Sequence, residues 1–531
     1  MTISRRGWLL AGAAGAAAAV AGCAEEPVGS GPVVAGTAAP TAPTASAASA
    51  SAGDWSRFAR RIDGAVVRPG DPAYEVRRLT ENPRYDGARP LAVVTVAHAA
   101  DVATTFAFAQ DHGMPVAIRS GGHSYPGWSA GGAAGTGVPS SLVIDCRALD
   151  TVHVTGRVTG RVTGRVTGQT EQTATVGAGA ALAPVYAALA ARGRAIAGGS
   201  CATVGVGGLT LGGGVGVLTR AMGLTCDSVA GMEIVTADGR VRTVDADHDP
   251  DLFWALRGGG GGHLGVVTSF TFATAPAPRL HTFYLSWPVT QARAVVEAWQ
   301  SWAPGADDRL WSTLKVLGGD THPAGPTLLV SGTWTGPGDP DLSGLLDHCP
   351  APSVRTVRAR TYGEAMASYA GCAAVPVSRC HTGPGGDLDR EAFGATSHVA
   401  YRALPAAGID ALLDRVAGAA GLKEAGISMD ALGGKVRDLA PGDTAFVHRE
   451  ALMTVQYTAT YNGDAGRQAD TFARGFRAAM TPYWGNHAYV NYADPTLHDP
   501  QQAYFGANAS RLARVRSSYD PHGFFRQPQA F

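Results

Sequence analysis

Apolar runs bounded by glycine and proline predict alternating strands and helices early in the folded chain. Residues 90–96 form a run typical of a buried strand, and residues 101–112 carry apolar side chains at helical spacing before Gly113. Residues 115–119 predict the next strand. A strand, a helix and a second strand in this order place the two strands parallel in one sheet. Ligands bind at the carboxyl ends of such strands, so the segment after residue 119 is the first candidate for a site.

The same patterns predict further elements up to residue 272. A four-residue motif, Thr-Gly-Arg-Val, repeats between Thr155 and Gly168. We expect the repeat to lengthen a surface hairpin, and a basic binding arm is the alternative. Around it the sequence predicts a helix at residues 181–192 and strands at residues 142–145, 152–155, 173–176 and 232–239, the last ending in an Asp-Gly turn before another strand.

A change of pattern begins near residue 276. An amphipathic helix at residues 290–302 precedes strands at residues 327–333 and 453–461. This pattern favours an antiparallel sheet with helices on one face, which leaves the second face open toward a ligand. We therefore expect an α+β protein in which this sheet covers a site built by the preceding domain.

The first residues predict an export signal. Arg5 and Arg6 form a twin-arginine motif, and the apolar run that ends at Ala21 is too short to span a bilayer. The segment ending at Cys23 resembles a bacterial lipobox, which predicts a lipid anchor on that cysteine; a signal peptide cut nearby without lipid is the alternative. Residues 24–53 are rich in Ala, Ser, Thr, Pro and Gly and predict a disordered tether.

Composition narrows the class of protein without naming an activity. The 531 residues are 45% hydrophobic and 16% charged, with a formal net charge of zero. This balance indicates a globular protein with no nucleic-acid partner and no attraction to an acidic membrane surface. The length allows two or three domains, each with its own core.

Two glycine-rich segments carry the candidate chemistry. Residues 119–125 read Arg-Ser-Gly-Gly-His-Ser-Tyr, and residues 198–208 place Cys201 in a similar setting. Glycine lets backbone N–H groups approach a phosphate without interference from a Cβ atom, and runs of such amides bind anions. The pair of segments therefore predicts a cofactor with a diphosphate, and it sets His123 and Cys201 beside that cofactor as nucleophiles.

Together with their flanks, these segments resemble the berberine bridge enzyme branch of the vanillyl-alcohol-oxidase-like flavoproteins. The resemblance implies FAD bound covalently through His123 at the 8α-methyl group and through Cys201 at C6. It also implies a two-part PCMH-type FAD-binding domain at residues 54–275, a substrate domain at residues 276–475 and a C-terminal module at residues 476–531. The further FAD contacts that it implies are Arg119, Ser120, Gly121, Gly122, Ser124, Gly199, Val204, Gly205, Gly207, Gly208, Gly213, Val267, Asn491 and Tyr492.

The expected reaction needs a base. Oxidation of an alcohol by flavin delivers a hydride to N5 and removes the hydroxyl proton, and the resemblance nominates Tyr489 for the second task. A free phenol titrates near pH 10, so a phenolate at neutral pH needs about 4 kcal/mol of stabilisation. We expect Tyr492 or Gln456 to contribute to it, and Asn491 to bind the flavin or the backbone.

Two positions bear on the electron acceptor. Val204 matches the small gatekeeper of relatives that react with oxygen, which predicts an oxidase that makes hydrogen peroxide. Leu209 stands where many plant relatives have a histidine near the flavin, so the reduced flavin needs another donor, for which Arg119 and a helix N-terminus are candidates. A monomer acting on sugars, oligosaccharides or glycosylated polyketides is expected. A dehydrogenase with another acceptor and a non-catalytic binding lipoprotein remain alternatives.

The disulfide prediction concerns the cysteines that are bonded to neither flavin nor lipid. With Cys23 and Cys201 assigned to those groups, five of the seven cysteines remain, so at least one thiol is unpaired. Cys372 and Cys380, separated by a short segment with a proline, form the expected bridge. Two buried free thiols are the alternative.

Overall fold

The computed structural model describes residues 50–158, 161–162, 165–166 and 171–531. The predicted export signal, Cys23 and most of the predicted tether lie outside these residues and stay predictions. The first helix, α1 (Ala52–Ala59), begins just after Ser51, whose side chain accepts a hydrogen bond from the Asp54 amide. No helix in the described part of the chain has the length and apolar character needed to cross a membrane.

The first sheet is small and partly parallel, as the sequence predicts. Its central strand pairs parallel with a strand on each side, and α3 (Ala99–Asp111) makes the crossover over an apolar core that includes Val102 and Phe106. The two predicted strands therefore share a sheet but do not touch, because a third strand lies between them. In order across the sheet the strands are β1 (Ala65–Val67), β2 (Ala92–Thr95), β4 (Leu142–Asp145) and β3 (Val116–Arg119).

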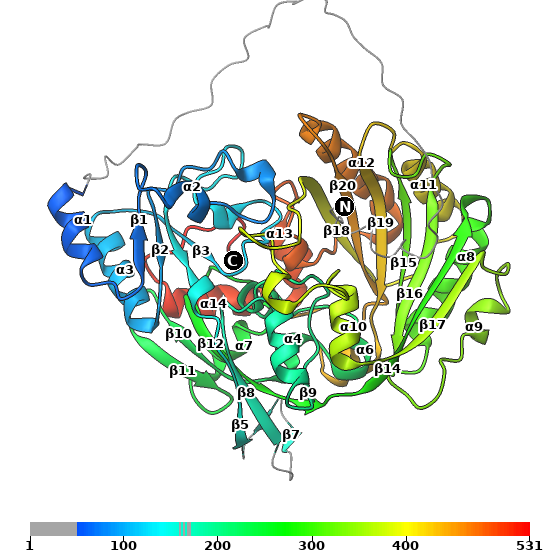
Figure 1. Cartoon of the computed structure of the whole chain (residues 1–531), viewed down its shortest axis with the longest axis horizontal. Coiled ribbons are helices and arrows are strands. Elements are labelled where there is room, and N and C mark those ends of the chain that lie inside the picture. The colour runs from blue at the N-terminus through cyan, green and yellow to red at the C-terminus, as the bar shows by residue number, and fades with distance from the viewer. Residues whose placement is uncertain (1–49, 159–160, 163–164, 167–170) are drawn as a thin grey trace, which may run out of the picture.

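The second sheet is antiparallel and belongs to the same half of the molecule (Figure 1). Its apolar core includes Phe270 and Phe272 together with residues of α4 (Leu182–Ala190). The Thr-Gly-Arg-Val repeat falls at β5, β6 (Arg161–Val162) and β7 (Arg165–Val166), and the last two pair antiparallel. In order across the sheet the strands are β11 (Val241–Asp245), β10 (Val229–Val235), β12 (Val266–Ala273), β8 (Glu171–Gly177) and β5 (Val152–Val158).

The third sheet has seven antiparallel strands and forms the other half of the molecule (Figure 1). One face packs against α8 (Ala292–Trp302), α11 (Ala406–Ala417) and α12 (Gly466–Trp484) in a single apolar cluster. The expectation of a sheet with helices on one face is confirmed. In order across the sheet the strands are β17 (Val354–Thr361), β14 (Arg279–Pro288), β16 (Thr327–Trp334), β15 (Leu310–Gly318), β19 (Glu424–Ala431), β20 (Met453–Thr460) and β18 (Phe393–Ala400).

Short elements complete the described residues. Two of them, α13 (Pro500–Phe505) and α14 (Ala509–Tyr519), lie against the half that holds the first two sheets. For example, Arg511 of α14 pairs with Asp251 of α7 (Pro250–Ala255) at 2.7 Å. The remaining helices and strands are α2 (Tyr74–Arg77), β9 (Arg194–Ala195), α5 (Val206–Leu211), α6 (Thr219–Met222), β13 (Ala275–Pro276), α9 (Ser343–Leu346) and α10 (Tyr362–Tyr369).

Polar contacts join the half that holds the first two sheets to the half formed by the seven-stranded sheet. Arg84 holds Asp470 of α12 through two hydrogen bonds of 2.9 Å each. In the loop between α10 and β18, Arg390 donates to the Thr80 carbonyl at 2.8 Å. The same loop contains the disulfide between Cys372 and Cys380, which confirms the predicted bridge. These contacts fix the sheet of one half over the glycine-rich segments of the other.

Candidate active site

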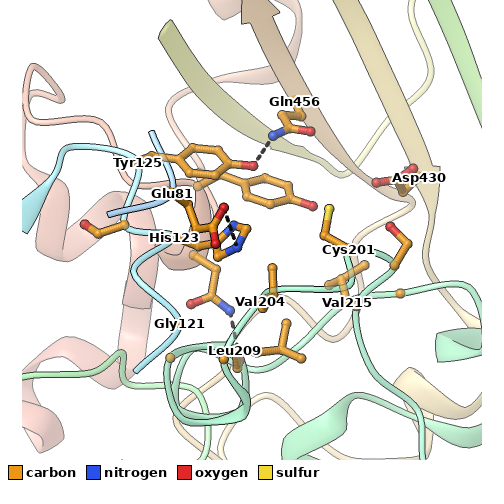
Figure 2. A pocket seen from close by; sticks show the side chains of 18 of the residues that line it. Glu81, Gly121, His123, Tyr125, Cys201, Val204, Leu209, Val215, Asp430 and Gln456 are labelled. Atoms are coloured by element: carbon orange, nitrogen blue, oxygen red, sulfur yellow. Dashed lines mark hydrogen bonds and ion pairs between the residues drawn. The ribbon is translucent and has the colours of Figure 1, made fainter. Parts of the chain in front are cut away.

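A cavity of 770 Å³ lies between the two halves. One wall is formed by both glycine-rich segments, and the opposite wall is formed by the face of the seven-stranded sheet that the helices do not cover. Figure 2 shows His123 and Cys201 on the first wall, with Gln456 and Asp430 on the second. The cavity thus brings together segments that are far apart in the sequence.

Glycine is required where the two segments meet. A Cβ atom on Gly121 would lie 2.3 Å from the Gly205 nitrogen, and one on Gly205 would lie 2.0 Å from Ser120 Oγ. Gly208 lines the cavity differently, because a Cβ atom there would meet nothing within 4 Å. The wall therefore combines tight backbone packing with a bare surface that a bound group can approach closely, which fits the diphosphate cofactor that the sequence predicts.

The two candidate attachment residues differ in their surroundings. His123 Nε2 lies 2.8 Å from Thr203 Oγ1 and 3.9 Å from Glu81 Oε2. The His123 side chain lies on the cavity wall. Cys201 is an exposed free thiol on the cavity wall. Both residues therefore suit covalent attachment of a group that occupies the cavity.

Most of the predicted site residues line this cavity. The structure brings together there Ser120, Gly121, Gly122, His123, Ser124, Gly199, Cys201, Val204, Gly205, Gly207, Gly208, Val267, Gln456, Asn491 and Tyr492. Three predicted residues lie outside the lining, namely Arg119, Gly213 and Tyr489.

Arg119 is a structural residue in this fold. Its guanidinium is fully buried, lies 3.0 Å from the Asp145 carboxylate and donates to the Arg77 and Arg78 carbonyls at 2.7 and 3.0 Å. It joins the ends of two neighbouring strands to α2, so it is not the flavin donor that the sequence analysis considered. Gly213 takes a positive φ of 118° with Phe446 beside it, so its role is also in the backbone.

The surroundings of Tyr489 do not favour the role of base that the sequence predicts for it. Its hydroxyl oxygen accepts hydrogen bonds from the Gly214 amide at 2.8 Å and from the Asn491 side chain at 2.9 Å. Apolar side chains surround the ring, and burial raises the pKa of Tyr489 well above its ordinary value despite these two donors. A protonated phenol outside the cavity lining is poorly suited to accept a substrate proton, and the structure instead makes it a support for the loop at Gly214.

Tyr492, unlike Tyr489, belongs to the cavity lining. It lines the cavity and stacks on Tyr125, with ring centroids 5.4 Å apart and planes within 6°. Gln456 donates a hydrogen bond to the Tyr125 hydroxyl, as Figure 2 shows. Burial raises the pKa of Tyr492, and the nearby acidic groups, Asp430 among them, add to that rise. Tyr125 from the first glycine-rich segment, Tyr492 from the turn at residues 490–492 and Gln456 from β20 thus form one polar cluster in the cavity.

Sequence reasoning missed most of the sheet's polar wall. Strand β15 sends Trp311, Thr313 and Lys315 into the cavity and turns the residues between them toward the helices. The only signal for this was alternation along an apolar strand, which many strands share. Asp430 on β19 lies directly opposite Thr313 in the sheet register, so register decides which side chains meet.

Asp430 has the electrostatics of a proton acceptor. Burial raises the pKa of its carboxyl, and the neighbouring Thr313 side chain and the charge of Lys315 oppose that rise. The same carboxyl is close enough to Tyr492 to affect the titration of its phenol. An acid group and a phenol that interact in one cavity are a pair that can share and pass a proton.

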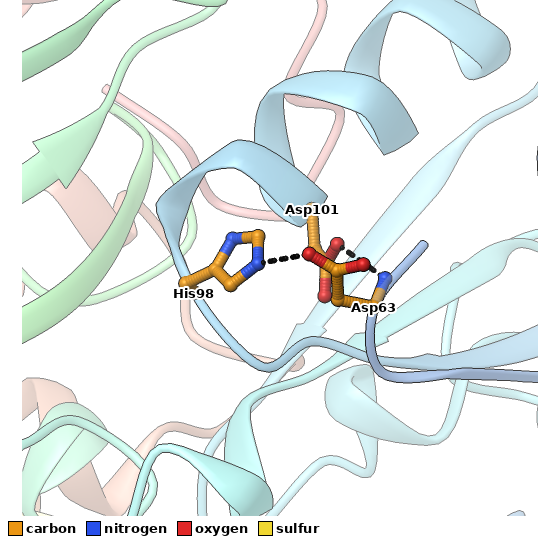
Figure 3. A group of neighbouring side chains, drawn as sticks. All are labelled: Asp63, His98 and Asp101. Carbon is orange, nitrogen blue, oxygen red and sulfur yellow. Dashed lines mark hydrogen bonds and ion pairs between the residues drawn. The ribbon is translucent and has the colours of Figure 1, made fainter. Parts of the chain in front are cut away.

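A second cluster of polar side chains, distant from the cavity, is structural. Asp63, His98 and Asp101 could offer ligand atoms to a metal (Figure 3). However, the Asp101 carboxylate already accepts hydrogen bonds from the amides of Asp63, Gly64 and Ala97, at 2.8 to 3.0 Å. The cluster ties two loops to the start of α3, and these bonds account for its geometry.

Comparison with known proteins agrees with this geometry. The family model described as FAD binding domain matches residues 90–245, and the model described as berberine and berberine like matches residues 488–530. These ranges contain both glycine-rich segments and the Tyr492 region. The fold and the cavity thus define an FAD-linked oxidoreductase.

Individual similar proteins identify the family to which the chain belongs. It is 30% identical to the FAD-linked oxidoreductase YgaK of Bacillus subtilis over 88% of this chain and 97% of that protein. It is also 30% identical to xylooligosaccharide oxidase of Thermothelomyces thermophilus, over 83% and 87% of the two chains. The structure of glucooligosaccharide oxidase from Acremonium strictum, which carries a 6-S-cysteinyl, 8α-N1-histidyl FAD, matches at a TM-score of 0.76 with 26% identity, over 90% of this chain and all of that one. The chain belongs to the berberine bridge enzyme-like family of FAD-linked oxidoreductases.

Proposed function

We propose that this protein is an oxidase that converts a hydroxyl group of a sugar, an oligosaccharide or a glycosylated natural product to a carbonyl group and reduces O₂ to H₂O₂. One observation carries the proposal. A single cavity brings the two candidate attachment residues, His123 and Cys201, together with Tyr492 of a C-terminal turn and Asp430 of the sheet. The relatives named as oligosaccharide oxidases support the choice of substrate class.

The residues present fit FAD. The bare wall at Gly208 and the close approach of Gly121 and Gly205 would receive the diphosphate, while His123 and Cys201 would hold the ring system through two covalent bonds. When bound, FAD supplies the chemistry of accepting a hydride at N5 and giving two electrons to oxygen. The chain's own residues have to position the substrate and take its hydroxyl proton.

Tyr492 and Asp430 would take that proton together. The pKa of Tyr492 is raised by burial, so the phenol stays protonated on its own at neutral pH. As the substrate gives its hydroxyl proton to the phenol oxygen, the phenol gives its proton to Asp430, whose pKa is also raised by burial. The sheet wall thus stores the proton, and Gln456, through Tyr125, keeps the stacked tyrosines in place.

Oxygen as the acceptor is supported by Val204. This residue lines the cavity three positions after Cys201, and its carbonyl is held by the Leu182 amide at 3.0 Å. A small β-branched side chain in a fixed loop leaves room beside the bound ring. The proposal therefore assigns Val204 the border of the oxygen path.

Peroxide formation in air tests this function. The purified holoprotein is offered mono- and oligosaccharides and glycosylated polyketides, and H₂O₂ is measured, with anaerobic bleaching of the flavin as a second readout. Bleaching with H₂O₂ supports the oxidase. Bleaching without reoxidation by air, followed by stopped flow, would assign a dehydrogenase with another acceptor. No bleaching by any hydroxyl compound would overturn the proposed reaction class.

A further inference from the structure

The edge strand of the seven-stranded sheet carries two arginines into the cavity. Arg358 and Arg360 of β17 both line it, and Arg358 lies opposite Thr282 of β14 in the sheet register. Successive side chains of a strand alternate between faces, so Arg355 of the same strand lies on the opposite face and is absent from the lining. The strand thus directs two of its three cationic side chains at the site.

Neither arginine is neutralised within the described residues. Arg360 donates from Nε to Thr282 Oγ1 at 3.1 Å, and neither guanidinium has a carboxylate oxygen within 4.0 Å in the part of the chain that the structure describes. Glu364, which Arg360 affects electrostatically, is committed to the Thr361 amide as the cap of α10, at 2.8 Å. Arg84, by comparison, has a carboxylate partner. Neither guanidinium therefore forms an ion pair within the described residues, and the cavity has a positive end at β17.

This positive end is remote from the proposed proton acceptor. Four strand spacings separate β17 from β19, which carries Asp430 (Figure 1). At the usual spacing of neighbouring strands this is roughly 19 Å. A group bound by the arginines and a hydroxyl beside Asp430 cannot belong to one sugar ring, whereas an oligosaccharide spans such a distance.

A polar track connects the two ends. Along one row of the sheet Thr356, Tyr284, Ser331 and Thr313 stand side by side and end at Asp430, and all of them line the cavity. Ser331 Oγ, from a side chain that is 1% exposed, has no hydrogen-bond partner in the structure. Buried polar atoms in proteins are nearly always hydrogen-bonded, so such an atom on a cavity wall indicates a ligand that completes it.

We propose that the substrate is an extended saccharide with an anionic group remote from the hydroxyl that is oxidised, and that Arg358 and Arg360 select it by binding that group. This inference rests on the proposed function and deepens it. A guanidinium offers paired N–H donors that match a carboxylate, a sulfate or a phosphate, and arginine is the residue suited to such recognition. Because Arg358 is exposed, the attraction weakens as salt is added.

The test compares substrates that differ in one charge. The probes are a neutral tetrasaccharide, the same chain with a uronate at the end remote from the oxidised hydroxyl, and the same chain with a sulfate there. Half-saturation is read from anaerobic flavin bleaching at low salt. We expect the uronate or the sulfate chain to half-saturate at least tenfold below the neutral chain, and the two charged arms show which anion is preferred.

Variants assign the effect to the arginines. The double variant Arg358→Gln/Arg360→Gln is expected to lose the preference by tenfold or more and to leave the neutral chain within twofold of the parent. Arg355→Gln removes an equal charge from the other face of the same strand. It should change the half-saturation of neither the neutral chain nor the charged chains. Equal half-saturation of neutral and charged chains by the parent, or equal effects of both variants, would overturn the inference.

Failure of the proposed function can be distinguished from failure of this inference. If no chain bleaches the flavin, the reaction class is wrong, and equilibrium dialysis of the same probes against the holoprotein then decides the inference alone. Tighter binding of a charged chain to the parent than to the double variant supports the anion site. Binding that is equal for all three probes contradicts it.

Discussion

The two walls of the cavity are built by different means. The wall with His123 and Cys201 comes from two short segments in which backbone packs directly on backbone, as at Gly121 and Gly205. The facing wall comes from side chains on strands spread from β14 to β20, and only pairing register brings Asp430 beside Thr313. The first wall is local in sequence, whereas the second exists only in the folded sheet.

The two walls differ in how strictly the fold constrains their residues. At Gly121 no side chain fits, so steric constraint leaves a visible trace in the sequence. At Arg358 or Lys315 many polar residues would suit the strand equally, so we expect exchange there to leave the fold intact. We infer that the loop wall holds the cofactor and the sheet wall chooses the substrate, and each prediction below tests one side of that division.

The largest effect is expected on the loop wall. If both covalent links form, protein precipitated with acid stays yellow and its mass includes one FAD. His123→Ala and Cys201→Ala should each keep the flavin through the remaining bond, whereas the double variant should release all of it. Mass spectrometry of the denatured protein gives the measurement. Release of flavin from the unmodified protein would refute both links.

Two tyrosines at the turn of residues 490–492 provide a matched pair. Tyr492→Phe removes the proton acceptor, so anaerobic flavin reduction should slow by roughly two to four orders of magnitude. Tyr489→Phe removes a hydroxyl that lies outside the cavity lining and should slow the same step less than tenfold. Stopped-flow absorbance measures both. The reverse ranking would restore Tyr489 as the base.

A smaller and more selective effect is expected at Val204. Val204→Leu adds one methylene group in a packed loop, where overpacking costs about 1 to 3 kcal/mol or closes a passage. Reoxidation by air should slow by about tenfold or more while substrate reduces the flavin near the parent rate. Equal slowing of both half-reactions would indicate general damage, and unchanged reoxidation would remove Val204 from the oxygen path.

The smallest effects distinguish two glycines of the same wall. Gly121→Ala places a Cβ atom against backbone and should lower the free energy of unfolding by about 1 to 3 kcal/mol or more. Gly208→Ala meets no protein atom within 4 Å, and because Gly208 lies in α5 the change should raise the free energy of unfolding of the cofactor-free protein by about 0.5 to 1 kcal/mol while weakening FAD uptake. Denaturant titration and flavin titration measure the two. Equal destabilisation by both would contradict the bare surface at Gly208.

Sequence patterns anticipated the elements better than the contacts. The strand at residues 116–119, the helix that follows β2 and the sheet with helices on one face all follow from apolar spacing. The insertion of β4 between β2 and β3 does not, because pairing order depends on the whole sheet. The Cys372–Cys380 bridge was accessible because its two residues are close in the chain.

One physical cause explains why two predicted site residues lie outside the cavity lining. Arg119 and Tyr489 both stand in motifs beside true lining residues, and strand or loop geometry turns their side chains the other way. Tyr489 and Tyr492 lie three residues apart in a short 3₁₀ turn, so sequence cannot tell which ring enters the cavity. Asp430 lies in an ordinary apolar strand. It can be recognised as a candidate site residue only once the fold places Lys315 and Thr313 beside it.

The hydrogen bonds that support the loop at Gly214 also constrain how the molecule assembles. Tyr489 reaches Gly214 across 275 residues of sequence, and Asn491 reaches the Leu209 carbonyl across 282. Contacts of such separation form late, because loop closure has to precede them. The support of this loop is therefore incomplete until residues 489–491 have been synthesised, and we expect stable loading with cofactor to come after that point.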